Sequence, residues 1–257
     1  THPRFQKKHW QTLTKGTLGG SPCPMELMKK LVQEVGVSGI TVGYGSTEAS
    51  SWVSMTHPDD PLERRIATIG TPLECNQVKI VNPATGEDLP SRSQGEVCVK
   101  GLLMKGYHRM PAATAAVLDR EGWFHSGDLG EMDERGYVKI TGRMKDAILR
   151  GGIEIHPAEM EEVLYELPEI SEAQVFGYPH PQKGQGMAAW IRLKPKARLS
   201  EEAVLRYLKR KLGKEKLPDH VKFVSRFPTT RSGKVQKFKL AEMARTEYTR
   251  GKKPESA

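Results

Sequence analysis

One lysine follows a Ser-Gly pair in the segment TTRSGKVQKFK, residues 229–239, which carries four positive side chains: Arg231, Lys234, Lys237 and Lys239. Lysine is a compact point charge on a long stem, and a preorganised cation in a water-poor site stabilises the approach of two anions. The segment is therefore either a patch for polyanions or the setting of one catalytic lysine, Lys234.

Hydroxyl and carboxyl groups follow a strand-like run in GYGSTE, residues 43–48. Glycine lets backbone approach a ligand closely, Ser46 and Thr47 can bond phosphate oxygens, and Glu48 could hold Mg²⁺. A polar turn that caps a strand is the alternative. Neither this motif nor LGGSP, residues 18–22, is a Walker loop, because no Gly-Lys-Ser/Thr sequence follows.

A third acidic group lies in GWFHSGDLG, residues 122–130. Asp128 could accept both hydroxyls of a ribose, as acidic groups do in other nucleotide sites. The alternative is an Asx-turn, in which Asp128 satisfies its own backbone. His125 is expected to be packed or exposed rather than a base, since its spacing identifies no partner.

Two adjacent glycines, Gly151 and Gly152, follow the charged strand-like run GRMKDAILR, residues 142–150. A double glycine there favours a hinge, or a surface over which a thin ligand can lie. An ordinary hairpin turn is the alternative.

The first half of the chain predicts an α/β edge followed by short strands. Apolar residues at helical spacing, followed by a buried strand, indicate the edge of an α/β layer. Turn signals such as NPATGE separate the later strands, which predict a small β-barrel or sandwich. The expected helices are 23–36 and 111–118, and the expected strands are 39–45, 75–81, 95–101 and 136–143.

The second half predicts a compact α+β unit with a boundary at residues 142–146. We therefore expect two domains, residues 1–143 and 144–257. The expected helices of the second are 156–167 and 200–213, and its expected strands are 173–178, 187–194 and 220–226.

Charge is distributed unevenly between these halves. Residues 1–143 carry 17 Lys and Arg against 16 Asp and Glu, whereas residues 144–257 carry 23 against 15, within a net charge of +9. Such a field attracts nucleic acid and equally a phosphorylated small molecule. No nucleic-acid-binding motif is found, so a nucleic-acid partner is not expected.

Hydropathy and cysteine content indicate whether the chain crosses a membrane and in which redox compartment it lies. The longest apolar runs are too short for a transmembrane segment, and mean hydropathy is −0.55. Cys23, Cys75 and Cys98 have neither metal nor disulfide spacing, which favours reduced thiols in the cytoplasm or the mitochondrial matrix, although the organelle and the oligomeric state cannot be read.

Taken in order, LGGSP, GYGSTE, GWFHSGDLG, GYVKITGRMKDAILRGG, HPAEMEEVL and PTTRSGKVQKFKL resemble the adenylate-forming, or AMP-binding, enzyme superfamily. Within it, RGG, HPAEME and SGKVQKFKL are most similar to fatty acyl-CoA ligases of the acyl-CoA synthetase family member 2 type. The resemblance implies the C-terminal part of a large AMP-binding domain, with an α/β edge and a small barrel, and then a complete small C-terminal domain.

The resemblance implies an ATP-dependent ligase that joins a carboxylic acid, a fatty acid of medium chain length, to coenzyme A through an acyl-adenylate. The implied cofactors are ATP, Mg²⁺ and coenzyme A. The residues matched to nucleotide, phosphate, magnesium and ribose contacts are Gly20, Ser21, Pro22, Tyr44, Thr47, Glu48, Asp128 and Arg143.

In the second half, the resemblance implies that Lys145 is the hinge of a mobile small domain. Gly151 and Gly152 match the loop that lines a coenzyme A tunnel, and Lys234 matches the lysine that bridges carboxylate and α-phosphate.

The family's phosphate loop is expected to precede Thr1, so the 257 residues alone are expected to adenylate poorly. Two alternatives stay open: an adenylating enzyme with an acceptor other than coenzyme A, and a truncated product without catalysis. A basic nucleic-acid-binding module is the remote one.

Overall fold

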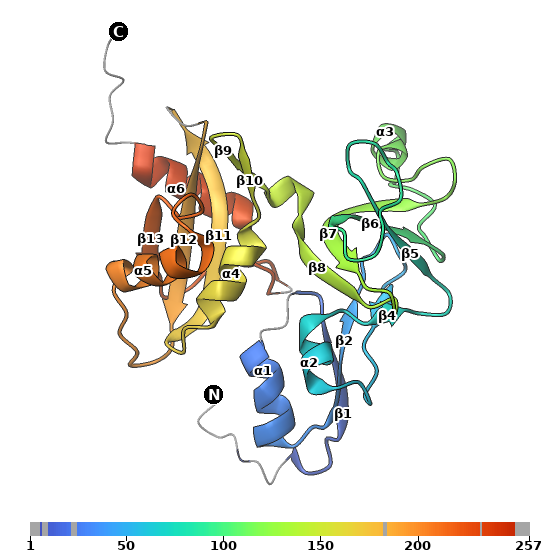
Figure 1. Cartoon of the computed structure of the whole chain (residues 1–257), viewed down its shortest axis with the longest axis horizontal. Coiled ribbons are helices and arrows are strands. Elements are labelled where there is room, and N and C mark those ends of the chain that lie inside the picture. The colour runs from blue at the N-terminus through green and yellow to red at the C-terminus, as the bar shows by residue number, and fades with distance from the viewer. Residues whose placement is uncertain (1–5, 7–9, 22–24, 182–183, 232, 250–257) are drawn as a thin grey trace. The chain divides into compact units, whose positions relative to one another are not determined.

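The computed structural model describes residue 6 and residues 10–21, 25–181, 184–231 and 233–249. The chain divides into two compact units, Thr1–Thr141 and Gly142–Ala257, each with its own sheets and buried cores (Figure 1). The expected mixture of α/β and α+β structure is confirmed. The assignment of residues 1–143 and 144–257 to a large and a small AMP-binding domain stays a prediction.

The first unit begins with a four-stranded sheet in the order β1-β2-β3-β4. β1 and β2 are parallel, and a helix connects them, as parallel neighbours require. This helix ends at Gly36, whose φ of 92° suits glycine. The bounds are β1 Lys15–Gly19, α1 Met25–Lys29, the π-helical η2 Lys30–Val35, β2 Gly39–Tyr44, β3 Ser54–Met55, α2 Leu62–Ala67 and β4 Thr71–Pro72.

A small core fixes β2 within this sheet. Met28 of α1 and Ile40 and Val42 of β2 are buried together, and Leu62 of α2 packs against the same cluster. Burial of such side chains is the main favourable term in folding. The expected helix and strand of this segment are therefore confirmed, and the strand ends at Tyr44.

A second sheet of the first unit corrects the predicted barrel. Its order is β5-β6-β7-β8, and no pairing closes β5 onto β8 in this fully described stretch. The strand β7 was not expected, because its Ser-Gly-Asp sequence is typical of a turn. The bounds are β5 Gln77–Val81, β6 Gly95–Lys100, α3 Pro111–Ala115, β7 Phe124–Met132 and β8 Val138–Arg143.

The second unit is a three-stranded sheet, in the order β11-β12-β13, with helices on both faces (Figure 1). A two-stranded hairpin and a 3₁₀ turn precede it. The bounds are η3 Met144–Asp146, β9 Ile148–Arg150, β10 Ile153–Ile155, α4 Pro157–Tyr165, β11 Ile170–His180, β12 Gly184–Leu193, α5 Glu201–Leu212, β13 His220–Phe223 and α6 Lys237–Thr249.

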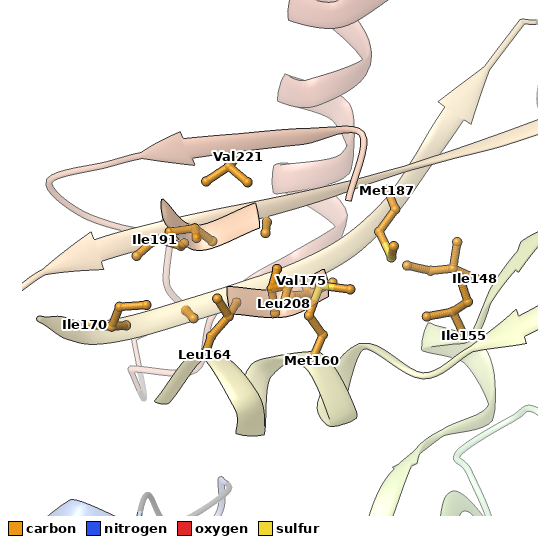
Figure 2. Close-up of a cluster of buried hydrophobic side chains, with 13 residues drawn as sticks. Ile148, Ile155, Met160, Leu164, Ile170, Val175, Met187, Ile191, Leu208 and Val221 are labelled. Atoms are coloured by element: carbon orange, nitrogen blue, oxygen red, sulfur yellow. The ribbon is translucent and has the colours of Figure 1, made fainter. Parts of the chain in front are cut away.

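Alternation along β11 sends side chains to two separate cores. Val175 packs with Met160 and Leu164 of α4, as Figure 2 shows, and with Leu208 of α5. Phe176, the next residue, lies in the other core with α6. This period-two pattern is that of a sheet buried on both faces.

Two local expectations are settled by the backbone. Gly151 and Gly152 form the two-residue turn between β9 and β10, with φ of 57° and 82°, so the hairpin alternative is the observed conformation. The last four residues of the motif SGKVQKFKL, residues 237–240, form the first turn of α6, a helix that was not expected from the sequence.

Leu208→Ala should destabilise the second unit by about 2–5 kcal/mol, because the deleted side chain is fully buried and leaves a cavity. Urea unfolding followed by circular dichroism measures the change. Leu149→Ala is the matched control, since that leucine is 64% exposed, and an equal loss in both variants would contradict the described core.

Candidate functional site

Tyr44 and Asp128 meet in the first unit although 84 residues separate them. The Tyr44 hydroxyl donates a hydrogen bond of 2.6 Å to Asp128 Oδ2. Tyr44 ends β2 and Asp128 lies within β7, so the bond connects the unit's two sheets. Asp128 is only 6% exposed, and a buried carboxylate requires such partners.

Glycines at the ends of β1 and β2 make room for an aromatic ring. Gly19 and Gly43 are paired in register, and a Cβ on either would lie within 2.8 Å of the Trp52 ring. A side chain at either glycine would therefore displace Trp52. These positions require glycine for close packing rather than for a special φ.

The loop after Tyr44 is tightly folded. A Cβ on Gly45 would lie 1.6 Å from the Ser51 carbonyl oxygen, so no other residue fits there. Ser50 and Ser51 adopt left-handed φ values of 52° and 86°. Strained non-glycine residues of this kind cluster at functional loops. Ser46 Oγ is buried and lacks a hydrogen-bond partner within the described part of the chain.

Glu48 is held by a residue that sequence reasoning missed. Tyr107 Oη donates to Glu48 Oε1 at 2.9 Å, and this hydrogen bond raises the pKa of Tyr107. The Met104 amide donates to the Glu48 carbonyl oxygen at 2.8 Å. Tyr107 therefore orients the carboxylate and Met104 holds the backbone of Glu48, through contacts 59 and 56 residues away that no local motif reveals.

Asp128 lies in a bulge of β7. Cys98 of β6 pairs with His125, and Glu96 pairs with Leu129. Three residues of β7 therefore oppose one residue of β6. Bulges are frequent beside active sites, where they redirect a side chain. The Asp128 amide donates to Ser126 Oγ at 3.1 Å, which is a local turn contact within the strand.

His125 has the partner that its spacing did not reveal. Its Nδ1 lies 2.8 Å from Glu96 Oε2, and its Nε2 lies 3.6 Å from Asp119 Oδ2. Cys98 Sγ is 3.5 Å from the same Nδ1. Burial and then the charge of Glu96 raise the pKa of the Cys98 thiol from 9.0 to about 12.

The other expected residues of the first unit lie at the ends of β1 and β2. Gly20 follows β1 with a left-handed φ of 83°, and the exposed Ser21 comes next. Thr47 is exposed in the loop after β2. Pro22 and Cys23 lie outside the described residues. The structure thus joins Tyr44 to Asp128, whereas the ligand contacts expected of Gly20, Ser21 and Thr47 stay predictions.

The second unit holds the remaining candidates in separate segments. Arg143 ends β8, Lys145 is exposed in the 3₁₀ turn η3, and Gly151 and Gly152 are exposed in the β9-β10 turn. Exposure and glycine content fit segments that contact a ligand or a partner domain. Their roles stay predictions.

Lys234 is presented by a small hairpin. The Thr230 amide donates to the Lys234 carbonyl oxygen at 2.8 Å, and the Lys234 amide donates to Thr230 Oγ1 at 3.1 Å. Thr229 and Val235 form a bridge beside this turn. The lysine side chain is exposed, as a charge that meets a ligand from outside the unit would need to be.

Lys237, three residues on, anchors this hairpin. Its Nζ lies 2.8 Å from Glu161 Oε1 of α4 and donates to the Val175 carbonyl oxygen at 3.1 Å. Glu161 also accepts from the Val175 amide at 2.8 Å. This partly buried ion pair ties the start of α6 to α4 and β11. Because Lys237 is used in this way, the lysines of the segment do not all belong to one exposed patch.

Two family models match the chain. The model of the AMP-binding enzyme covers residues 1–108, and the model of the AMP-binding enzyme C-terminal domain covers residues 159–234. The chain belongs to the AMP-binding, adenylate-forming enzyme superfamily.

Two curated relatives are acyl-CoA-ligating by name. YngI, a candidate acyl-CoA synthetase of Bacillus subtilis, is 43% identical over 94% of this chain and 44% of its own length. The mitochondrial medium-chain acyl-CoA ligase ACSF2 of Danio rerio is 38% identical over 97% of this chain and 41% of its own length. The chain thus spans less than half the length of these relatives.

Three solved structures are similar to this chain in fold. ATP-bound MatB of Rhodopseudomonas palustris has a TM-score of 0.87, 33% identity, and 96% and 48% coverage of the two chains. The o-succinylbenzoate CoA synthetase of Bacillus subtilis with its acyl-adenylate intermediate has a TM-score of 0.75 and 32% identity, and the match covers 87% of this chain and 45% of that one. The amide bond synthetase McbA of Marinactinospora thermotolerans has a TM-score of 0.81 and 30% identity, and the match covers 90% of this chain and 47% of that one.

No helix among the described residues combines the length and apolar character needed to cross a membrane. The described cysteines, Cys75 and Cys98, are both free.

Cys98 should resist alkylation by iodoacetamide at pH 8, whereas Cys75 should react. Cys98 is buried and its raised pKa keeps the thiol protonated, while Cys75 is exposed. Because the folded pKa exceeds the unfolded value, the stability linked to Cys98 should be lost as pH rises from about 9 to about 12. Peptide mass spectrometry distinguishes the two thiols, and equal labelling of both in the folded protein would contradict the prediction.

Proposed function

We propose that the protein is an ATP-dependent acid–thiol ligase that converts a carboxylic acid to its coenzyme A thioester through an acyl-adenylate. In the first step a carboxylate oxygen attacks the α-phosphorus of ATP and pyrophosphate leaves. In the second, the sulfur of coenzyme A attacks the acyl carbonyl and AMP leaves. The observation that carries the proposal is the Tyr44–Asp128 hydrogen bond, in a chain of the AMP-binding family.

The adenosine of ATP would bind at the ends of β1 and β2. Gly20, Ser21 and Pro22 would lie against the adenine, and the Tyr44 ring would cover its face. The left-handed Gly20 lacks a side chain and so leaves room for an approaching ring system. Tyr44 would serve twice, because its hydroxyl holds Asp128 while its ring contacts the base.

The ribose hydroxyls would be held by Asp128 and Arg143. A carboxylate accepts hydrogen bonds from both hydroxyls of a ribose, and the bond from Tyr44 to Oδ2 fixes its plane before the nucleotide arrives. Such preorganisation reduces the ordering cost of binding.

The phosphates would meet the loop after β2. Thr47 would donate to a phosphate oxygen, and the unpartnered Ser46 hydroxyl offers a second donor nearby. Glu48 would hold Mg²⁺, whose preferred ligands are oxygens, and Tyr107 already orients that carboxylate. When bound, the cation would offset the negative charge of the phosphates.

Lys234 would bridge the substrate carboxylate and the α-phosphate. Two anions must approach each other in this step, and a cation placed between them stabilises the transition state. The hairpin that presents Lys234 is tied at Thr230, and Lys237 anchors it to Glu161, so the exposed side chain extends from a supported base.

Coenzyme A would bind the second unit. Gly151 and Gly152 would line its tunnel, and Lys145 would be the hinge about which the unit turns between half-reactions. The excess of cations in residues 144–257, 23 against 15 anions, suits a cofactor that carries several phosphates.

The acid would be a fatty acid of medium chain length, since the zebrafish relative is named a medium-chain ligase. The free Cys75 and Cys98 fit a reducing compartment, either the cytoplasm or the mitochondrial matrix.

A second candidate is an adenylating enzyme that delivers the acyl group to an acceptor other than coenzyme A. The likeness to an amide bond synthetase at a TM-score of 0.81 favours it. Both candidates share the first half-reaction and differ only in the second.

Lys234→Ala, made in the longest natural polypeptide that contains this chain, should slow adenylate formation roughly 10²–10³-fold, because the charge that bridges two anions is lost. Thioester formation from supplied acyl-adenylate should change less than about threefold, since no such approach of anions occurs there. Pyrophosphate exchange and single-turnover thioester formation measure the two steps.

Lys239→Ala is the matched control for this experiment, because Lys239 is an exposed lysine of the same segment, directed over the Phe238 ring. It should leave both steps near wild type. Equal loss of both steps in Lys234→Ala would mean that the lysine is structural.

The acceptor should be coenzyme A. AMP release by the wild-type polypeptide, compared with coenzyme A, pantetheine, a carrier protein and a primary amine, should be fastest with coenzyme A because its phosphates meet the basic unit. Faster turnover with pantetheine or the amine would favour the second candidate, and no acid-dependent pyrophosphate exchange would refute both.

A further inference from the structure

We propose that Glu96 is a positioning residue for Asp128, which it places by holding the bulge of β7. The inference rests on the proposed function, in which Asp128 contacts the ribose. It assigns to a buried glutamate of β6 a part in nucleotide selection, although the side chain itself does not face the nucleotide.

The register of the two strands defines the bulge. Between the pairs Cys98–His125 and Glu96–Leu129, β6 contributes only Val97, whereas β7 contributes residues 126–128. Val97 can pair with only one of these three residues, so two residues of β7 are left outside the ladder. Their unpaired backbone groups need other partners, because a buried polar group without one costs about 1–3 kcal/mol.

Glu96 supplies partners at two places in the bulge. Its Oε1 accepts from the Gly127 amide at 3.0 Å, and its Oε2 lies 2.8 Å from His125 Nδ1. Glu96 is 7% exposed, so water competes little for these bonds. One carboxylate thus holds the residue before Ser126 and the residue after it.

Ser126 completes the arrangement. Its hydroxyl donates to the Val97 carbonyl oxygen at 2.6 Å and accepts from the Asp128 amide at 3.1 Å. Gly127 adopts a φ of 69°, which a side chain would strain, although the space around it is open. The backbone at Asp128 is therefore fixed by contacts that begin at Glu96 and Val97.

Asp128 is consequently held from two directions. Its amide belongs to the bulge, and its carboxylate accepts from Tyr44 at 2.6 Å. Loss of the bulge contacts would release the backbone at Asp128, so the oxygens of its carboxylate would no longer have one position relative to a ribose. Displacement by about 1 Å is enough to reduce a catalytic or binding contact strongly.

The same side chains also place three possible metal-ligand atoms close together. One atom each from Glu96, Cys98 and His125 lie within 4.8 Å of one another. The hydrogen bonds to Gly127 and His125 already account for both oxygens of Glu96. A positioning role is therefore the one that these contacts favour.

The first test measures ribose discrimination in the longest natural polypeptide that contains this chain. We compare kcat/KM for ATP, 2′-deoxy-ATP and 3′-deoxy-ATP. Glu96→Ala should reduce the preference for ATP about tenfold or more, the scale of a lost hydrogen bond to a charged group. Glu96→Gln should lose less, because its amide oxygen can still accept from Gly127. Glu131→Ala, at a glutamate of β7 that lies outside the bulge, should leave the preference unchanged.

The second test does not depend on activity. Amide hydrogen exchange of the 257-residue chain should accelerate at Gly127 at least about tenfold in Glu96→Ala, and less in Glu96→Gln. Unchanged exchange at Gly127 in Glu96→Ala would overturn the proposal whether or not the protein is a ligase.

The outcomes separate the two proposals. Equal loss of kcat/KM for all three nucleotides in Glu96→Ala would make Glu96 merely structural and overturn the inference. A wild-type enzyme that does not distinguish the three nucleotides would refute the ribose contact of Asp128 in the proposed function. Faster exchange at Gly127 would then still support the arrangement of the bulge, but its role in nucleotide selection would fall with that contact.

Discussion

The first unit depends on the hydrogen bond that Tyr44 donates to Asp128. A strand end of one sheet and a bulge of another are connected by this 2.6 Å contact, and the core formed by Ala49, Val53, Val99 and Phe124 packs beside Tyr44. The tyrosine is thus both a core residue at its ring and a polar one at its tip, a combination that tyrosine offers at boundaries between apolar and polar surroundings. Any nucleotide site built on these residues inherits its geometry from sheet packing rather than from a flexible loop.

In the second unit, a sheet buried on both faces and one ion pair support the loops. Its sheet is buried on both faces, and the ion pair of Glu161 with Lys237 links helices α4 and α6, which cover those two faces. The hairpin of Lys234 directly precedes α6, so its base is anchored while its tip is exposed. An anchored base with an exposed tip suits a residue that acts only in one stage of a reaction.

Sequence reasoning identified residues where the constraint is local and missed those where it is not. Gly45 and the turn Gly151–Gly152 are constrained by backbone geometry within a few residues, so their glycines could be singled out, and the hairpin turn was one of the two expectations at the second position. The partners of Glu48 and His125 lie 59 and 29 residues away, and only tertiary structure brings them close. The closed barrel was wrong because alternation predicts strands but not whether the outer two pair. Helix α6 was missed because its charged residues interrupt a narrow apolar stripe, in which Leu240 and Ala244 are the buried residues.

The bulge of β7 has a consequence for insertions and deletions. Because it adds two residues, an even number, Leu129 keeps the same face of the sheet as His125, and the alternation resumes unchanged after it. Loss of a single codon within residues 126–128 would invert the faces of all the strand that follows, which would bury its polar side and expose its apolar one. Loss of the codons for Gly127 and Asp128 would preserve the strand and leave a regular ladder without its carboxylate. In related genes, length variation at this point should therefore occur in pairs, because only an even change keeps each side chain of the following strand on its own face.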